Sequence, residues 1–141
     1  MNRQQLLVLW FAVSCLSGVL PVVLGQSGSG IYTTYHYYDP AQNGYRLDGL
    51  YCATWRANES LQWRSQYPWT AFCAGPMGEA QCGKCIRVTN PSTGQSVVVR
   101  ILDKCANGGL DLDRIPFNQI DSNGQGYAAG HMTTSYTFVN C

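Results

Sequence analysis

The chain has 141 residues, of which 45% are hydrophobic and 12% are charged, and its formal net charge is +1 at pH 7. This length suits a single small domain with a modest hydrophobic core. The nearly neutral charge excludes a general electrostatic attraction to nucleic acids or anionic membranes, so a polyanion would have to be bound by a local basic patch.

The amino-terminal segment has the pattern of a secretory signal peptide. Arg3 supplies a positive charge, a largely apolar stretch covers residues 6–24, and the residues up to Gly25 resemble a cleavage site. A membrane anchor is the alternative, but serine, glycine and proline residues interrupt the apolar stretch. We therefore predict a signal peptide at residues 1–25 and a secreted domain at residues 26–141 that does not enter a membrane.

Seven cysteines are present, and one of them, Cys15, lies in the predicted signal peptide. The others are Cys52, Cys73, Cys82, Cys85, Cys105 and Cys141. An even number of cysteines in a small secreted domain indicates disulfides. Cys82 and Cys85 form a C-x-x-C pair, but a zinc site would need a second such pair, which the sequence lacks. We predict three structural disulfides, no metal site and no cofactor, and the residues themselves leave all fifteen pairings open.

The first half of the domain mixes strand and turn signals. Residues 26–30 are expected to form a loose arm, and residues 31–38 are rich in β-branched and aromatic side chains, which predicts a strand. Residues 50–55 are a second candidate strand. Residues 58–67 are expected to contain a short helix capped by Asn58, which also begins a possible N-glycosylation sequence, Asn-Glu-Ser.

The second half has a clearer β pattern. Residues 84–90 and 95–103 predict a hairpin, because two strand-like runs flank a turn that contains Pro91 and Gly94. A short helix is expected at residues 113–120. The last strand is expected within residues 131–141, with apolar side chains at every second position. Loops are expected at residues 75–83, 107–109 and 122–130. Several short strands with glycine-rich turns indicate a mainly β fold, a small closed barrel.

Long segments of the sequence resemble the barwin family, the plant pathogenesis-related proteins of family four. The segments are TTYHYYDPAQNGY, YCATWRA, LQWRSQYPWTAFC, QCGKCIRVTNPSTG, RILDKCANGGLDLD and GYAAGHMTTSYTFVNC. The resemblance covers residues 33–141 approximately and indicates a barwin domain without a hevein module. It implies a six-stranded double-psi β-barrel with a few short helices. It also implies three disulfide pairs: Cys52–Cys82, Cys73–Cys105 and Cys85–Cys141.

The family resemblance also implies a role. It indicates an antifungal plant defence protein that is secreted into the extracellular space, the apoplast, and is expected to be a monomer. Some family members cleave RNA, and weak binding of chitin oligosaccharides is also known in the family. We therefore expect a metal-independent ribonuclease, and the alternative is a non-catalytic module that binds chitin or related wall oligosaccharides.

The ribonuclease hypothesis depends on the two histidines, His36 and His131. Cleavage of RNA without a metal needs one base and one acid, and the imidazole pKa of about 6.5 suits both roles. Asp111 matches the acidic residue implicated in ribonuclease members and would orient one imidazole. RNA would be bound by a basic patch drawn from six residues that could equally be scattered solvated charges: Arg56, Arg64, Lys84, Arg87, Arg100 and Lys104.

The glycan-binding alternative depends on aromatic side chains, which stack on sugar rings. The weak candidates are Tyr35, Tyr37, Tyr38, Trp63 and Tyr127. Most aromatic residues of so small a domain are expected to fill the core. Hydrolysis of the glycan would need two carboxyl groups, and Asp103 with Asp111 or Asp113 is the conceivable pair.

Overall fold

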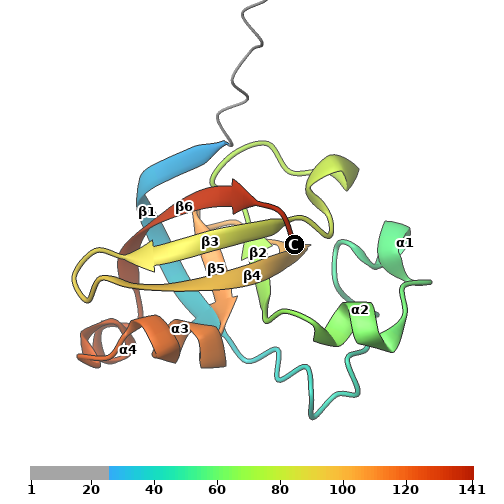
Figure 1. Ribbon diagram of the computed structural model, residues 1–141, viewed down its shortest axis with the longest axis horizontal. Coiled ribbons are helices and arrows are strands. Elements are labelled where there is room, and N and C mark those ends of the chain that lie inside the picture. Colours follow the sequence, from blue (N-terminus) through green and yellow to red (C-terminus); the bar gives the residue numbers. More distant parts are fainter. Residues whose placement is uncertain (1–25) are drawn as a thin grey trace, which may run out of the picture.

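The computed structural model describes residues 26–141, so the signal peptide predicted at residues 1–25 lies outside the described residues. Figure 1 shows a barrel with short helices at one end and, at one side, a looped extension that consists of residues 37–68, between β1 and β2. The elements are β1 (Ser27–His36), α1 (Ala53–Arg56), α2 (Leu61–Ser65), β2 (Trp69–Phe72), η1 (Glu79–Gln81), β3 (Cys85–Asn90), β4 (Gln95–Lys104), β5 (Leu110–Asp113), α3 (Arg114–Ile120), α4 (Gln125–Ala129) and β6 (Met132–Val139).

The six strands close into a barrel in the order β1-β5-β2-β4-β3-β6, which confirms the predicted fold class. The pairs β1–β5 and β2–β4 are parallel, and the other four pairs are antiparallel. The predicted β3–β4 hairpin is present. Closure gives every strand two neighbours, so no strand offers an unpaired edge.

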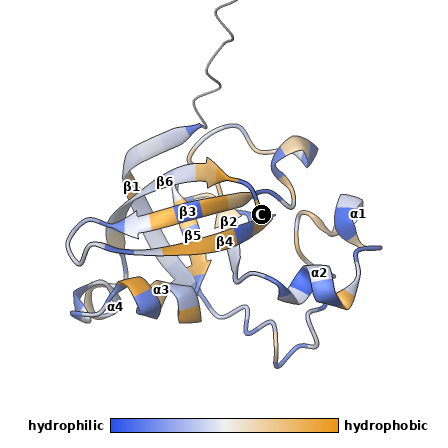
Figure 2. Ribbon diagram, in the orientation of Figure 1, coloured by the Kyte–Doolittle hydropathy of each residue, from blue (hydrophilic) through white to orange (hydrophobic). Residues whose placement is uncertain are grey.

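Apolar side chains from all six strands or their flanks fill the barrel. In β5, Leu110 and Leu112 are fully buried, while Asp111 between them points outward, as the two-residue period of a strand requires. Figure 2 shows that strongly hydrophobic segments lie on β3, β4 and β6. The buried core residues are Phe72, Ile86, Val88, Val99, Ile101, Leu110, Leu112, Phe117, Ile120, Met132 and Tyr136.

A second, smaller core lies outside the barrel, beneath the looped extension. Its buried residues are Tyr38, Leu47, Cys52, Trp69, Cys82 and Leu102. Trp69 and Leu102 come from barrel strands, whereas Tyr38 and Leu47 come from the segment that follows β1. The extension is therefore packed against the outer surface of β2 and β4 rather than free in solution.

Three disulfides join the elements: Cys52–Cys82, Cys73–Cys105 and Cys85–Cys141, with sequence separations of 30, 32 and 56 residues. These are the pairs that the family resemblance implies. The first holds α1 to the end of η1, the second joins the segments after β2 and β4, and the third fixes the last residue to the start of β3. Each closes a loop that constrains the unfolded chain, which in the chain-entropy model contributes roughly 3–4 kcal/mol.

Three local predictions are wrong. Residues 27–30 belong to β1 rather than to a loose arm, because they pair with β6 and Gly28 lies against the ring of Tyr136, where a Cβ would come within 2.7 Å. Residues 50–55 are not a strand, because the chain turns into α1 at the buried disulfide of Cys52. The cap of α2 is Ser60, whose Oγ accepts from Trp63 N, and not Asn58.

The sequence pattern does not predict β2, β5 or two of the helical turns. β2 is buried at all four positions, so it shows no alternation of apolar and polar residues. β5 is only four residues long and follows directly on the predicted glycine turn. The turns η1 and α4 lie in segments that were expected to be loops, and both are too short to carry helical periodicity.

A buried contact between Thr33 of β1 and Thr134 of β6 gives a testable prediction for this pair of strands. Both hydroxyls are buried, and the two oxygens lie 2.8 Å apart, while Thr33 Oγ1 also donates to the carbonyl of Ile31 at 3.2 Å. Thr134 must therefore be the donor of the shared bond. We expect Thr33→Val to cost about 1–3 kcal/mol in the free energy of unfolding, because it leaves the Thr134 hydroxyl unpaired, and Thr134→Val to cost less.

The measurement is denaturant unfolding with the disulfides intact. Adding Thr134→Val to Thr33→Val should recover part of the loss, because the unpaired hydroxyl is then removed. Equal and additive losses from the two substitutions would contradict this assignment of donor and acceptor.

Candidate functional site

A row of polar side chains crosses the outer surface of the barrel. Thr34 of β1 lies opposite Asp111 of β5, Asp111 lies opposite Ala71 of β2, and Ala71 lies opposite Asp103 of β4. Partners in register point to the same side of a sheet. The β2–β4 register shifts between Thr70 and Ala71, and Asp103 lies on the outer side because it bonds there to Tyr38. The small side chain of Ala71 therefore separates two carboxylates whose Cα atoms are two strand spacings apart, about 10 Å.

Asp111 is held in place from within the fold. Its Oδ1 accepts a hydrogen bond from Thr34 Oγ1 at 2.8 Å, and Thr34 Oγ1 in turn accepts one from Asn107 Nδ2 at 2.9 Å. Its Oδ2 lies 3.9 Å from Nδ1 of His36, whose side chain is 57% exposed. The two groups are therefore close without being hydrogen-bonded, and a small movement of the ring would complete a hydrogen bond.

Asp103 serves a different purpose. Its Oδ2 accepts from the hydroxyl of Tyr38 at 2.8 Å, and its Oδ1 accepts from the backbone N–H groups of Tyr51 and Lys104 at 3.0 and 2.9 Å. Donors from the fold thus occupy both oxygens. Asp113 is buried and accepts from the backbone of Asp39. Asp103 fastens the looped extension to the barrel, and this arrangement does not favour a role as one of two glycosidase carboxyl groups.

Burial, followed by the charge and the hydrogen bond of Asp103, strongly raises the pKa of the Tyr38 hydroxyl. Its ring is mostly buried and lies 4.5 Å from the ring of His36, centre to centre. Tyr38 is therefore a neutral hydrogen-bond donor throughout the physiological range, and it forms one wall beside the exposed imidazole.

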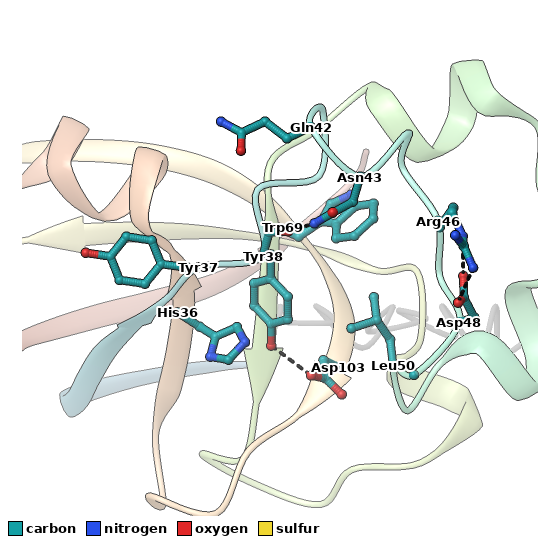
Figure 3. A pocket seen from close by; sticks show the side chains of 11 residues that line it. His36, Tyr37, Tyr38, Gln42, Asn43, Arg46, Asp48, Leu50, Trp69 and Asp103 are labelled. Carbon is teal, nitrogen blue, oxygen red and sulfur yellow. Dashed lines mark hydrogen bonds and ion pairs between the residues drawn. The ribbon is translucent and has the colours of Figure 1, made fainter.

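A cleft of about 610 Å³ opens between the barrel and the looped extension. Figure 3 shows His36 and Tyr38 directed toward Asp103, with Tyr37 directed away from them. Arg46, the cation of the cleft, is bound to Asp48 by two hydrogen bonds of 3.0 and 2.8 Å. The lining residues are His36, Tyr37, Tyr38, Gln42, Asn43, Arg46, Asp48, Gly49, Leu50, Trp69 and Asp103.

The structure places His131 elsewhere on the same outer surface. It immediately precedes β6, its ring stacks on that of Tyr32 at 4.9 Å, and it lines a separate depression of about 230 Å³. Tyr32 and His36 lie on the same side of β1 and are four residues apart, which is about 13 Å along a strand. The structure therefore brings His36 together with Asp111 and sets His131 further along β1.

Three of the candidate aromatic residues form one surface cluster. The ring of Tyr35 stacks on Tyr127 at 5.0 Å and meets the edge of Tyr37 at 6.0 Å, and the hydroxyls of Tyr37 and Tyr127 lie 3.3 Å apart. Tyr37 and Tyr127 are exposed. Tyr38 lines the cleft with the edge of a largely buried ring. These four residues surround the end of β1.

Trp63 does not join them. It lies beneath the guanidinium of Arg100, 3.9 Å from the centre of its ring, and beside Gly83 on another side of the molecule. Arg100 is itself buried, which lowers its pKa, and it donates to the carbonyl of Gly83 and to Gln66. Trp63 and Arg100 are therefore structural, and Arg100 cannot contribute to a basic patch for RNA.

Other predicted features are located as follows. Asn58 is exposed in the turn between α1 and α2, and its glycosylation stays a prediction. Within residues 26–141 no three His, Cys, Asp or Glu side chains gather as metal ligands, and no helix has the length and hydrophobicity that crossing a membrane requires. The roles of Thr34 and Asn107, which hold Asp111 in place, were not predicted. The two-residue spacing that puts Thr34 on the same face of β1 as His36 is visible in the sequence.

The Tyr38–Asp103 bond predicts alkaline behaviour. A hydroxyl with a raised pKa in the folded state retains its proton when the unfolded state loses it, so the free energy of unfolding should fall as the pH rises above 10, the ordinary value for tyrosine. Ultraviolet absorbance of phenolate should show that the folded protein and its Tyr38→Phe variant titrate with equal amplitude. On unfolding at this pH, the unsubstituted protein should gain one phenolate more than the Tyr38→Phe variant gains. A smaller folded-state amplitude in Tyr38→Phe than in the unsubstituted protein would contradict the assignment.

Comparisons with known proteins agree with this architecture. The family model described as "Barwin family" matches residues 27–141. Cerato-platanin 3 from M. perniciosa is similar in structure, with a TM-score of 0.59 and 18% identity over 82% of this chain and 95% of that one. The fungal elicitor cerato-platanin has a TM-score of 0.53 and 19% identity over 78% and 92% of the two chains.

An expansin from Clavibacter michiganensis, solved as a mutant in complex with cellohexaose, has a TM-score of 0.58 and 22% identity over 82% of this chain. The match spans about half of the expansin, 51% of its length. These structural likenesses show a shared fold, the double-psi β-barrel. Because the family model covers nearly the whole described sequence, the chain belongs to the barwin family.

Proposed function

We propose that this protein is a secreted plant defence protein whose cleft beside His36 binds a neutral cell-wall glycan. The observation that carries the proposal is the lining of the cleft, which combines aromatic rings, side-chain amides and a carboxylate with no cation free of a partner among its residues. The barwin family and the likeness to expansin support a role at the cell wall.

The charges of the cleft favour a neutral polymer over a polyanion. Asp103 lines the cleft, Asp111 lies beside it at 3.9 Å from the imidazole of His36, and Arg46 is paired with Asp48. Binding of nucleic acid depends chiefly on Lys and Arg side chains that contact phosphates. A phosphodiester near His36 would instead face carboxylates, whereas the hydroxyls of a sugar can donate to them.

The shape and chemistry of the cleft suit a sugar chain. Its volume lies within the range of small-molecule sites, and the exposed face of His36 beside Tyr38 offers a flat surface on which a pyranose ring can stack. The exposed amide of Gln42 can bond to sugar hydroxyls. Because the expansin of similar fold was crystallised with cellohexaose, a β-linked glucan or its N-acetylated counterpart, chitin, is the proposed ligand class.

Titration calorimetry with cellohexaose and with a chitin hexamer tests the glycan proposal. His36→Ala should weaken binding about tenfold through loss of the stacking surface, and Gln42→Ala by a somewhat smaller factor through loss of a hydrogen bond. Tyr32→Ala is the matched control, because Tyr32 is an equally exposed aromatic residue of β1 that lies outside the cleft. The site would be refuted if His36→Ala and Gln42→Ala bound the oligosaccharides as tightly as the unsubstituted protein, or if Tyr32→Ala lost as much affinity as they do.

Cleavage of RNA is the second candidate, and the His36–Asp111 pair favours it. In this reaction His36 would take the proton of the 2′-hydroxyl, the freed oxygen would attack phosphorus, and the bond to the 5′-oxygen would break as an acid protonates that oxygen. His131 would be the acid. Since the ring of His131 stacks on Tyr32, four residues before His36 on the same side of β1, the phosphate would have to lie over Thr34, between the two imidazoles.

RNA cleavage in the presence of a chelator tests this second candidate. His36→Ala and His131→Ala should each lower the rate by about 10²-fold or more, and Asp111→Asn should lower it less, because Asp111 orients the base without transferring a proton itself. Glu79→Gln, at an exposed carboxylate on η1, is the matched control. Full activity in the His36→Ala/His131→Ala double variant would eliminate this mechanism.

A further inference from the structure

The hydroxyls of two exposed tyrosines meet at the surface although 90 residues separate them in sequence. Tyr37 follows β1 and Tyr127 lies in α4, and their phenolic oxygens are 3.3 Å apart. The two side chains are 56% and 46% exposed. Both rings are therefore open to reagents in solution while they remain in contact with each other.

Neighbouring groups fix this arrangement. The ring of Tyr35 packs on the buried Phe117 at 4.9 Å and stacks face to face on Tyr127, so that it supports Tyr127 from the core side. The guanidinium of Arg114 lies 5.5 Å from the centre of the Tyr37 ring. The hydrogen bond to Tyr127 raises the pKa of Tyr37.

We propose that Tyr37 and Tyr127 are a site of oxidative crosslinking, at which a peroxidase and hydrogen peroxide convert the pair into an intramolecular dityrosine. Each phenol loses one electron and one proton, and the two phenoxyl radicals form a carbon–carbon bond between the ring carbons ortho to their hydroxyl groups. The hydrogen on each of those carbons moves to the oxygen, which restores both hydroxyls. The protein loses two hydrogen atoms in total, and the peroxide accepts them and becomes two molecules of water.

The geometry favours this pair over the other tyrosines of the described residues. Coupling requires the hydroxyl-bearing edges of two rings to meet, as they do in Tyr37 and Tyr127, whereas Tyr35 presents its face to Tyr127. Tyr32 is as exposed as Tyr127, but its ring is stacked on His131. Because the two partners already touch, coupling within one molecule has a high effective concentration and outpaces coupling between molecules in dilute solution.

The crosslink would join two elements that are in contact through side chains alone, the end of β1 and α4. The start of α4 is held by Asp121, whose carboxylate accepts from the backbone N–H groups of Gly126 and Tyr127 at 2.8 Å each. A covalent bond from Tyr127 to Tyr37 would tie α4 to the end of β1, beside the cleft. This proposal does not depend on glycan binding or on RNA cleavage.

The experiment treats the purified, disulfide-bonded protein in dilute solution with a haem peroxidase and hydrogen peroxide. The expected product is a monomer with dityrosine fluorescence and a mass lower by two hydrogen atoms. After reduction and digestion with trypsin, the peptide that ends at Arg46 should be joined to the peptide that begins at Ile115. Tyr37→Phe and Tyr127→Phe should abolish the monomeric product, and Tyr32→Phe, the matched control, should retain it.

Sequencing of the joined peptides from the unsubstituted protein locates the bond without any variant. Fluorescence that is confined to dimers would overturn the proposal, because it would indicate random coupling between molecules. A bond mapped to other tyrosines, a monomeric product that survives in Tyr127→Phe, or the absence of any product would overturn it equally.

Discussion

The parallel pairing of β1 with β5 is the constraint on which the rest of the structure depends. It inserts the first strand between a strand from the second half of the domain and the last strand, and so closes the barrel. Close approach of the backbones is needed here, because a Cβ on Gly109 would collide with the carbonyl of Tyr32. The same register sets Thr34 against Asp111, which fixes the position of the carboxylate that faces His36. The strand pairing that closes the barrel is thus the same pairing that positions the carboxylate of the site.

The looped extension gives this barrel its cleft. A barrel of six strands has an interior filled by side chains, so a ligand has to bind on its outside. Packing of Tyr38 and Leu47 against β2 and β4 creates a second wall there, and the bond from Tyr38 to Asp103 sets its position. The cleft then has aromatic surfaces, amides and carboxylates, a combination that suits neutral sugars better than phosphates. The charges of the cleft, more than its histidine, distinguish the two functions considered for it.

Much of the fold could be predicted from the sequence, because the hairpin, the final strand and the helix that begins near Asp113 have strong local signals. The family resemblance supplied the barrel topology, which no local pattern contains. β2 was missed because it is buried on both faces, and α1 because the disulfide of Cys52 outweighs the strand preference of its neighbours. Of the site, His36 and Asp111 were predictable as residue types. The separation of His131 from these two residues could not be predicted, because it depends on how β6 pairs with β1 and on the stacking of His131 on Tyr32.

The barrel is closed by pairing of its first strand with its last, and this has a consequence for the order in which the protein folds. β1 is the first strand of the barrel to be synthesised, whereas its partners β5 and β6 are the last two, and Cys85 pairs with Cys141, which follows it by 56 residues. Contacts between such distant segments form slowly, because the cost of closing a long loop precedes the gain from pairing. The barrel therefore cannot close before β6 has been synthesised, and the disulfide of Cys85 cannot form before Cys141 is present. Closure of the barrel is thus a late event that involves the whole domain at once, rather than a stepwise addition of strands.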